Sequence, residues 1–299
     1  MNDVTCVFES HNALGEGPVW DVGEQALYWV DIPRPGSSLH RWKPTTGEHN
    51  RWPLPEMATA FALREKGGVL TATPSGVKLF DPQTGNMTLF CQPEKDLPRN
   101  RSNDGKCDRK GRFWFGSMWN NLDEQGGDLP IEQNSGRLYR VDPDGSWREM
   151  DAGFGISNTF AWSPDNRTMY FGDTYSGLYA YDFDLESGTV SNRRDFCMVK
   201  EPGMCDGSTI DAQGYLWNAR WDGGCLLRIA PDGTVDRVVE LPVSRPTSCT
   251  FGGPNLDILY VTSASSGLTA EQRAAQPYAG GIFAVQTGVA GLPEPRFAG

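Results

Sequence analysis

Short apolar runs separated by polar turns recur along the whole chain. Six of these runs mix aromatic or branched residues with small ones, as buried strands do. They lie at residues 26–32, 67–73, 111–118, 168–174, 214–220 and 258–264. A second predicted strand follows each run, at residues 39–42, 77–80, 138–141, 178–181, 226–229 and 282–285. A third precedes each run, at residues 17–20, 58–63, 105–108, 159–163, 208–211 and 248–252.

The turns between these strands contain the residues that tight reversals need. Residues 142–145 (DPDG) and 231–233 (PDG) combine the preset φ of proline with a glycine that accepts φ > 0. Helical periodicity is confined to residues 269–276. Six copies of one strand unit, roughly 40 to 60 residues apart, indicate a radial repeat, because each unit must bury its apolar face against its neighbours.

The sequence therefore predicts an all-β fold, namely a six-bladed β-propeller formed by residues 1–299 as a single domain. The final strand, at residues 281–285, is expected to pair with residues 5–8 and close the ring, as propellers do to avoid an exposed edge. In such a ring the first strand of each blade lines the central channel.

Polar residues stand at the start of several of these first strands. Alignment of the six copies places Glu16, Thr59, Asn103, Asn158, Asp206 and Thr247 at corresponding positions. Four of the six could hold a cation or a polar ligand. The alternative is that Asn and Asp at these points are turn formers that satisfy local backbone groups. Four at equivalent positions in different repeats favour the functional interpretation.

Composition and charge narrow the classes of function. The formal net charge of −11 and the pI of about 4.8 argue against nucleic acid and anionic membranes as partners, because both need a basic face. No apolar run approaches the length of a membrane span, and residues 1–10 show neither the basic n-region nor the apolar core expected of an export signal. A cytoplasmic enzyme fits these features, either as a monomer or as a small homo-oligomer.

The cysteines and histidines argue against nucleophilic catalysis by a triad. The seven cysteines include no C-x-x-C pair, which favours reduced, mostly buried thiols over a thiolate zinc site. Cys107 and Cys205 lie close to the candidate site in sequence, so a catalytic thiol is conceivable. None of the three histidines is near these segments, and no G-x-S-x-G elbow is present.

Two further segments bear on a site. Residues 119–135 form a long polar insertion, which predicts either a lid over a site or a disordered excursion, and its position after a site-bearing blade favours a lid. Met57 and Thr59 are expected in a pocket wall, and Phe61 in the packed core.

At this point five motifs resemble a known family. They are LGEGPVW with WVDI, RSNDGKCDRKGRFWFGSM, ISNTFAWSPDNRTMYFGDT, GMCDGSTIDAQGYLWNA and PTSCTFGGPNLDILYVTSA. In this order and spacing the chain resembles the regucalcin (senescence marker protein), gluconolactonase and sugar-lactonase family over essentially its full length. The resemblance implies a six-bladed propeller that binds one divalent cation in its channel and hydrolyses sugar lactones to aldonic acids.

The resemblance also implies roles for individual residues. The cation ligands of the family match Glu16, Asn158 and Asp206, and its substrate-contacting pair matches Arg101 and Asn103. The family usually has Gly after the ligand Asn. Thr159 stands there in this chain and is expected to add a side chain beside the metal and reshape the pocket. Where some members have a Glu after the strand end, this chain has Trp119, Asn120 and Asn121, so Asn121 is the substrate-binding candidate there.

The chemistry of these residues is consistent with that assignment. Two carboxylates and an amide oxygen suit Ca²⁺, Mg²⁺, Mn²⁺ or Fe²⁺, with Zn²⁺ also possible. The cation would polarise the lactone carbonyl, and either Asp206 or a metal-bound hydroxide would act in the attack. Arg101 would donate to oxygens of the lactone. The alternative for Arg101 is a salt bridge to Asp96 or Asp104.

Three functions follow from these observations. The first is a divalent-metal-dependent sugar lactonase of bacterial-type sugar oxidation, acting between an aldose dehydrogenase and an aldonate dehydratase. The second is an esterase acting on non-sugar esters or lactones. The third is a non-catalytic calcium-binding or scaffold propeller, for which a large exposed apolar patch is expected.

Overall fold

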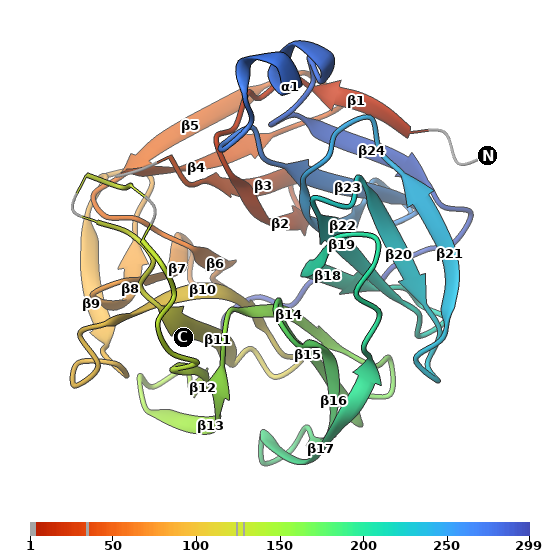
Figure 1. The fold of residues 1–299 in the computed structure, drawn as a ribbon. Coiled ribbons are helices and arrows are strands. Elements are labelled where there is room, and N and C mark those ends of the chain that lie inside the picture. The colour runs from red at the N-terminus through yellow and green to blue at the C-terminus, as the bar shows by residue number, and fades with distance from the viewer. Residues whose placement is uncertain (1–3, 34–35, 124, 128) are drawn as a thin grey trace.

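Six four-stranded antiparallel sheets are arranged in a ring around a central channel (Figure 1). The structure is a computed structural model that describes residues 4–33, 36–123, 125–127 and 129–299. Each sheet is one blade, and the ring confirms the predicted six-bladed β-propeller. The only helix in the described part of the chain is the short α1 (Ala270–Ala275), and no described helix has the length and hydropathy of a membrane span.

The two inner strands of each blade carry most of the buried residues. The innermost strands are β2 (Gly15–Asp21), β6 (Ala60–Leu63), β10 (Asn100–Cys107), β14 (Ser157–Trp162), β18 (Met204–Ile210) and β22 (Pro246–Gly252). The second strands are β3 (Ala26–Asp31), β7 (Val69–Thr73), β11 (Phe113–Trp119), β15 (Thr168–Asp173), β19 (Leu216–Trp221) and β23 (Ile258–Ser263). The second strands are buried on both faces, which is why their sequences contain the apolar runs that predicted them. The innermost strands were predicted too, but all except β6 begin earlier than expected.

The third strands were also predicted, but of the outermost strands only β1 was. The third strands are β4 (Ser37–Trp42), β8 (Gly76–Phe80), β12 (Gly136–Val141), β16 (Gly177–Asp184), β20 (Cys225–Ile229) and β24 (Ile282–Gln286). The outermost strands are β5 (His49–Leu54), β9 (Met87–Cys91), β13 (Trp147–Phe154), β17 (Thr189–Cys197), β21 (Val235–Glu240) and β1 (Val4–Phe8). Most residues of β13, β17 and β21 are exposed or half-buried, so these strands lack the apolar run that marks the others.

The ring closes through its first and last strands. β1 pairs antiparallel with β24, with Val4 opposite Val285, so the N-terminal strand completes the sixth blade as predicted. The expected helical segment is α1, which lies at the periphery near β1 and β24 in Figure 1. Thr269 caps it, because its hydroxyl accepts from the Gln272 N–H and the Gln272 side chain accepts from the Thr269 N–H in return.

The C-terminal residues extend across one end of the channel rather than into a blade. Phe297 is fully buried, and its main chain bonds to Leu63 and Glu65 of blade two. Lys106 of β10 forms an ion pair with Glu294 at 3.0 Å, and both side chains are largely buried. The tail therefore fills the end of the channel at which β10 finishes.

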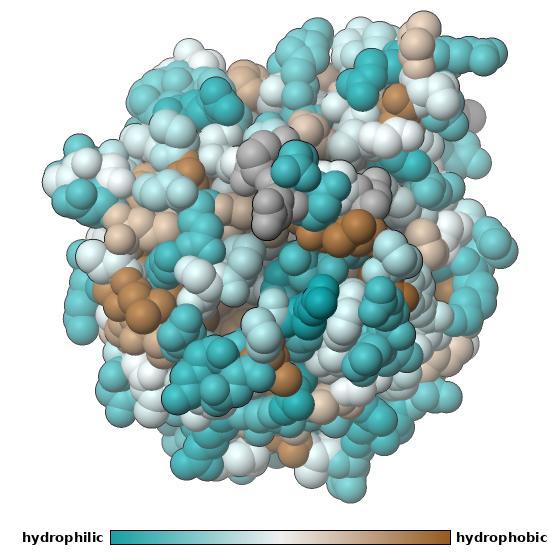
Figure 2. Space-filling view, turned by 60° about the vertical axis from the view of Figure 1, so that its left-hand side comes forward, coloured by the Kyte–Doolittle hydropathy of each residue, from teal (hydrophilic) through white to brown (hydrophobic). Residues whose placement is uncertain are grey.

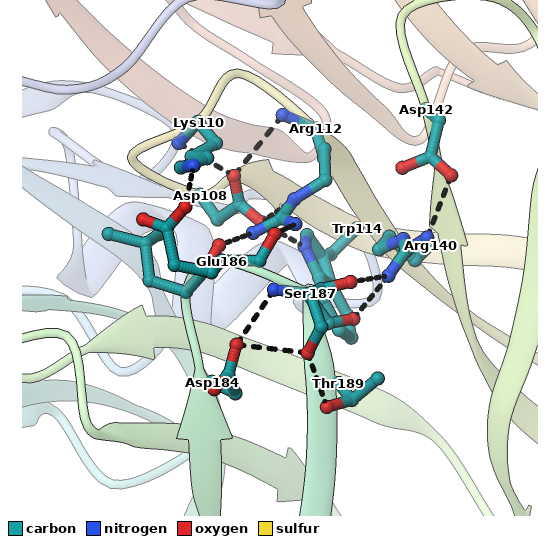
Figure 3. A network of polar contacts seen from close by, with 12 residues as sticks. Asp108, Lys110, Arg112, Trp114, Arg140, Asp142, Asp184, Glu186, Ser187 and Thr189 are labelled. Carbon is teal, nitrogen blue, oxygen red and sulfur yellow. Dashed lines mark hydrogen bonds and ion pairs between the residues drawn. The ribbon is translucent and has the colours of Figure 1, made fainter.

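A buried polar network joins blade three to blade four, as Figure 3 shows. Asp108 accepts from Arg112 Nε at 2.7 Å and from the indole of Trp114 at 2.8 Å. Arg112 then donates across the blade boundary to the carbonyl of Leu185 at 2.7 Å. Lys110 and Glu186 form a second, exposed ion pair at 2.5 Å. The carboxylate of Asp108 thus holds a buried guanidinium that links two blades.

We expect Asp108→Ala to lower the free energy of unfolding by about 3–5 kcal/mol, because it leaves the Arg112 charge buried without its partner. Lys110→Ala removes an exposed ion pair from the same network and should cost less than about 1 kcal/mol. Urea denaturation of the two variants beside the wild type measures both. Equal losses for the two would contradict the assignment of Asp108 as the main link.

Candidate functional site

Each candidate channel residue of blades one, three, four, five and six lies at a break in the pairing of its innermost strand. The regular register is interrupted between Glu16 and Val19, Ser102 and Gly105, Asn158 and Phe160, Cys205 and Ser208, and Pro246 and Ser248. The sequence predicted strands that begin after these residues. They lie inside the strands instead, at β-bulges, which bend a strand and redirect its side chains.

Most of the predicted residues meet in one cavity of about 660 Å³. Its wall contains all six residues proposed for the site, namely Arg101, Asn103, Asn121, Glu16, Asn158 and Asp206. Thr247 does not reach it. The Thr247 side chain is buried and donates to the carbonyl of Gly15 at 2.5 Å. Thr59 and Met57 line a smaller adjoining recess, and Phe61 is 2% exposed in the core, as predicted.

The amide of Asn158 is held in one orientation. Its Nδ2 donates to Thr174 Oγ1 at 2.7 Å, and its Oδ1 accepts from Asn103 Nδ2 at 3.1 Å. Asn103 Nδ2 also donates to the carbonyl of Ser157 at 2.9 Å. The amide oxygen of Asn158 is therefore directed toward Asn103, another residue of the cavity wall, with its nitrogen already bonded elsewhere.

Three carboxylates lie close together in this part of the channel. Burial, and then the charges of Asp206 and Asp104, raise the pKa of Glu16 well above its usual value. Burial, and then the charge of Asp104, raise the pKa of Asp206 in the same way. Lys106 lowers the pKa of Asp104 and Arg220 lowers the pKa of Asp206, but burial has the larger effect on both. The cluster therefore has a deficit of positive charge.

Asp104 is the member of this cluster that sequence reasoning missed as a site residue. Burial raises the pKa of Asp104 to about 6, against hydrogen bonds from the N–H groups of Gly105 and Thr159 that lower it. Neighbouring residues of a regular strand face opposite sides, so Asn103 and Asp104 would not be expected in one site. The bulge between Ser102 and Gly105 removes that alternation.

Arg101 is held by amide groups of the site. Asn121 Oδ1 accepts from Arg101 Nη2 at 2.9 Å and from Nε at 3.3 Å. Asn103 Oδ1 accepts from Arg101 Nη1 at 3.1 Å. The bonds that the described residues form with Arg101 include these two amides and the carbonyl of Ser102 at 2.9 Å, and they do not include the alternative salt bridge to Asp96 or Asp104. The two other substrate-binding candidates therefore orient the guanidinium at the cavity wall.

The insertion at residues 119–135 reaches from blade three toward blades one and two, where it is yellow-green in Figure 1. Asn121 lines the cavity, and Leu122 packs against the core cluster that contains Ile32 and Met57. Residues 124 and 128 of the insertion lie outside the described residues. The packing of Leu122 places this part of the insertion beside the cavity. A lid function for it stays a prediction.

Thr159, Cys107 and Cys205 do not have the roles in the site that the sequence suggested. Thr159 does not reshape the cavity, because its side chain is fully buried and its hydroxyl donates to the carbonyl of Asp206 at 2.5 Å. All seven cysteines are free thiols. Burial raises the pKa of Cys205 to about 12 and the pKa of Cys107 well above its usual value, and neither residue lines the cavity. Neither thiol is poised to act as a nucleophile.

The three residues proposed as metal ligands all offer oxygen atoms to the cavity. Glu16 and Asp206 offer carboxylates, and Asn158 offers its oriented amide oxygen. Within the described ranges no group of three or more His, Cys, Asp or Glu side chains has the arrangement of a metal site. The candidate set contains two carboxylates and one amide, and no histidine or cysteine lines the cavity. Such a set fits a cation that prefers oxygen ligands.

Comparison with known proteins places the chain in a family. The family model described as SMP-30/Gluconolactonase/LRE-like region matches residues 14–265. The chain belongs to this family. The family resemblance noted in the five sequence motifs is thereby confirmed, and the matched range contains every candidate residue of the site.

Several known proteins are similar to this chain over nearly its whole length. A 6-deoxy-6-sulfogluconolactonase of Pseudomonas putida is 38% identical, with all of both chains covered. Regucalcin of Xenopus laevis is 35% identical over 99% of this chain and 98% of its own. The solved structure of regucalcin from Agrobacterium tumefaciens, described as a calcium-binding protein, has a TM-score of 0.90 at 32% identity and covers 99% of this chain and 97% of its own. A luciferin-regenerating enzyme has a TM-score of 0.89 at 28% identity and covers all of both chains.

The raised pKa of Asp104 predicts how stability depends on pH in chelator-treated protein. The folded-state pKa of about 6 lies above the ordinary value of 3.8, so the stabilisation is present at low pH and is lost as the pH rises through 6. Between pH 5 and pH 8 this group should lower the free energy of unfolding by about 1–2 kcal/mol.

Asp104→Asn cannot titrate and should lose that part of the pH dependence. Urea denaturation in EDTA at the two pH values measures the difference. Asp195→Asn, which changes an exposed carboxylate on β17, should keep the wild-type dependence. If the Asp104→Asn protein kept the wild-type pH dependence of the free energy of unfolding, Asp104 could not be the source of that dependence.

Proposed function

We propose that the protein is a divalent-cation-dependent lactonase that hydrolyses an aldonolactone to the aldonic acid. One observation carries the proposal. A single cavity gathers Glu16, Asn158 and Asp206 beside Arg101 and Asn103, in a chain that is 38% identical over its full length to a sugar lactonase. The acids supply cation ligands, and the arginine and amides supply donors and acceptors suited to a polar ring.

Glu16, Asp206 and the Oδ1 atom of Asn158 would hold the cation. When bound, a divalent cation supplies a Lewis acid that polarises the lactone carbonyl and stabilises the negative charge on its oxygen during attack. The three residues come from β2, β14 and β18, so their spacing is set by the ring rather than by a flexible loop. Ca²⁺, Mg²⁺, Mn²⁺, Fe²⁺ and Zn²⁺ are all compatible with this donor set.

Asp206 is the proposed general base. It would accept a proton from the water whose oxygen attacks the carbonyl carbon of the lactone. The bond between that carbon and the ring oxygen then breaks, and Asp206 returns the proton to the ring oxygen, which leaves as a hydroxyl group. Arg101 and Asn103 would hydrogen-bond to oxygens of the sugar and hold it against the acids, with Asn121 fixing the guanidinium.

The surface of the protein supports an enzyme over an interaction scaffold. Figure 2 shows hydrophobic residues in small separate groups on the face drawn, between hydrophilic ones. The large exposed apolar side chains of the described residues include Leu89, Trp147, Tyr175 and Val238, which come from different blades. A scaffold is expected to present one contiguous apolar patch. The cavity, by contrast, concentrates charged and amide groups.

The substrate would come from a reaction that oxidises the anomeric carbon of an aldose, because that oxidation yields a lactone. The product, an aldonic acid, would be consumed by a reaction such as dehydration. The cavity wall also contains Arg245, whose guanidinium stacks on Trp221 at 4.8 Å and forms an ion pair with Asp222 at 2.6 Å. Lactones that carry an anionic group therefore belong in a substrate panel with the neutral ones.

We expect EDTA-treated protein to lose at least about ten-fold in lactone hydrolysis and to recover with one added divalent cation. A pH-indicator assay with neutral and anionic aldonolactones, each metal being added back singly, measures this and identifies the preferred sugar. Aryl esters in the same assay test the esterase alternative. Unchanged turnover after chelation would contradict the proposed metal dependence. If folded protein hydrolysed no lactone with any added cation, the proposed lactonase activity would be wrong.

Asp206→Asn should lower kcat by about 10²- to 10⁴-fold, because the amide cannot accept the proton. Asp195→Asn makes the same chemical change on the exposed face of β17 and should leave kcat unaltered. Initial rates at saturating lactone and cation, with the melting temperature of each variant measured alongside, separate lost catalysis from lost folding. A folded Asp206→Asn protein with wild-type kcat would exclude the assignment.

A further inference from the structure

We propose that Thr159 is a positioning residue that clamps blade four to the main chain of Asp206. The inference rests on the proposed function only in taking Asn158 and Asp206 as two ligands of one cation. It concerns how this chain fixes the distance between those two ligands, which come from different blades. The clamp consists of Thr159, Ser208 and Asn218.

The contacts of the clamp are short and fully buried. Thr159 Oγ1 donates to the carbonyl of Asp206 at 2.5 Å and lies 2.8 Å from Ser208 Oγ. Asn218 Nδ2 donates to the same carbonyl at 3.0 Å and to Ser208 Oγ at 2.9 Å. Thr159 and Asn218 are 0% exposed and Ser208 is 2% exposed. Buried networks of this kind rigidify a site when every member is satisfied.

The carbonyl of Asp206 needs these donors because of the bulge in β18. Cys205 pairs with Arg220 and Ser208 pairs with Asn218, and the two residues between them have no partner in the ladder to β19. Side-chain donors from two strands take the place of the missing ladder bonds. The position of the Asp206 main chain is therefore set by β14 and β19 as well as by its own strand.

The preceding residue, Asn158, makes a parallel connection. Its Nδ2 donates to Thr174 Oγ1, which in turn donates to the carbonyl of Cys205 at 3.1 Å. Consecutive residues of β14, Asn158 and Thr159, thus connect to consecutive carbonyls of β18, those of Cys205 and Asp206. This two-point connection fixes the two strands, and so the two ligands, relative to each other.

The backbone of Thr159 is strained in a way that fits a functional role. Its φ is +57°, a left-handed conformation that β-branched residues rarely adopt. The residue is held there by its hydroxyl bond and by a hydrogen bond from its N–H to Asp104. Strain of this kind persists where the surroundings over-determine a conformation, and it concentrates at functional sites. Thr159 therefore contacts the main chain or side chain of two of the three clustered acids.

Thr159→Val and Thr159→Ser test the clamp. Valine keeps the branched shape and removes the hydroxyl, whereas serine keeps the hydroxyl and removes the methyl. We expect Thr159→Val to weaken Ca²⁺ or Zn²⁺ binding, measured by calorimetric titration, at least ten-fold and to lower kcat by a similar factor. Thr159→Ser should remain within about two-fold of the wild type in both. Thr209→Val, which removes another buried hydroxyl from β18, is the matched control and should behave as the wild type.

Asn218→Ala removes the second donor to the same carbonyl from β19 and should reproduce the pattern of Thr159→Val, so the test does not depend on one variant folding. A lower melting temperature with wild-type cation affinity and kcat would overturn the proposal, because that is the signature of a merely structural contact. Cation binding that weakens as expected in a protein that opens no lactone would support the clamp and remove the lactonase. If the protein hydrolyses lactones but Thr159→Val and Thr159→Ser do not differ in cation affinity or kcat, the result would support the lactonase and overturn the clamp.

Discussion

A residue that leaves the strand ladder to face the channel must have its main-chain polar groups satisfied by other partners, because buried N–H and C=O groups are costly when unpaired. The candidate site depends on this constraint. The bulge that frees Asp206 leaves its carbonyl to the side chains of Thr159 and Asn218. In blade six, Thr247 lies at a similar break and donates to the carbonyl of Gly15, next to Glu16.

These side-chain bonds cross between blades and therefore couple the site to the whole ring. Thr59 of blade two donates to Ser102 of blade three, and Asn103 of blade three donates to the carbonyl of Ser157 in blade four. Each such bond fixes one innermost strand against the next. The ring is closed by the pairing of β1 with β24 and by the bond from Thr247 of blade six to Gly15 of blade one. The spacing of the clustered acids is therefore a property of the closed ring.

The sequence was sufficient for the fold and for naming residues that meet in one cavity. The second strand of each blade is buried on both faces, so its apolar run identifies it, and Glu16 and Asp206 stand out as acids at equivalent repeat positions. The outermost strands other than β1 were missed because exposed strands such as β17 carry mostly polar residues. Asp104 was missed because only a bulge brings it to the same side as Asn103. The buried role of Thr159 could not be inferred either, since it depends on a carbonyl 47 positions further along the chain.

The acid cluster opposes folding and at the same time favours ligand binding. Burial and mutual repulsion raise the pKa values of Glu16 and Asp206, and the nearby cation Arg220 offsets this for Asp206 only in part. The guanidinium of Arg220 donates to carbonyls at residues 199–203 rather than to a carboxylate, and so holds the chain that leads into β18. If the clustered carboxylates could move apart, they would no longer repel one another, and they would also lose their affinity for a cation. Because the bonds between blades prevent that relaxation, the repulsion is retained, and the free energy of cation binding would add directly to the stability of the folded ring.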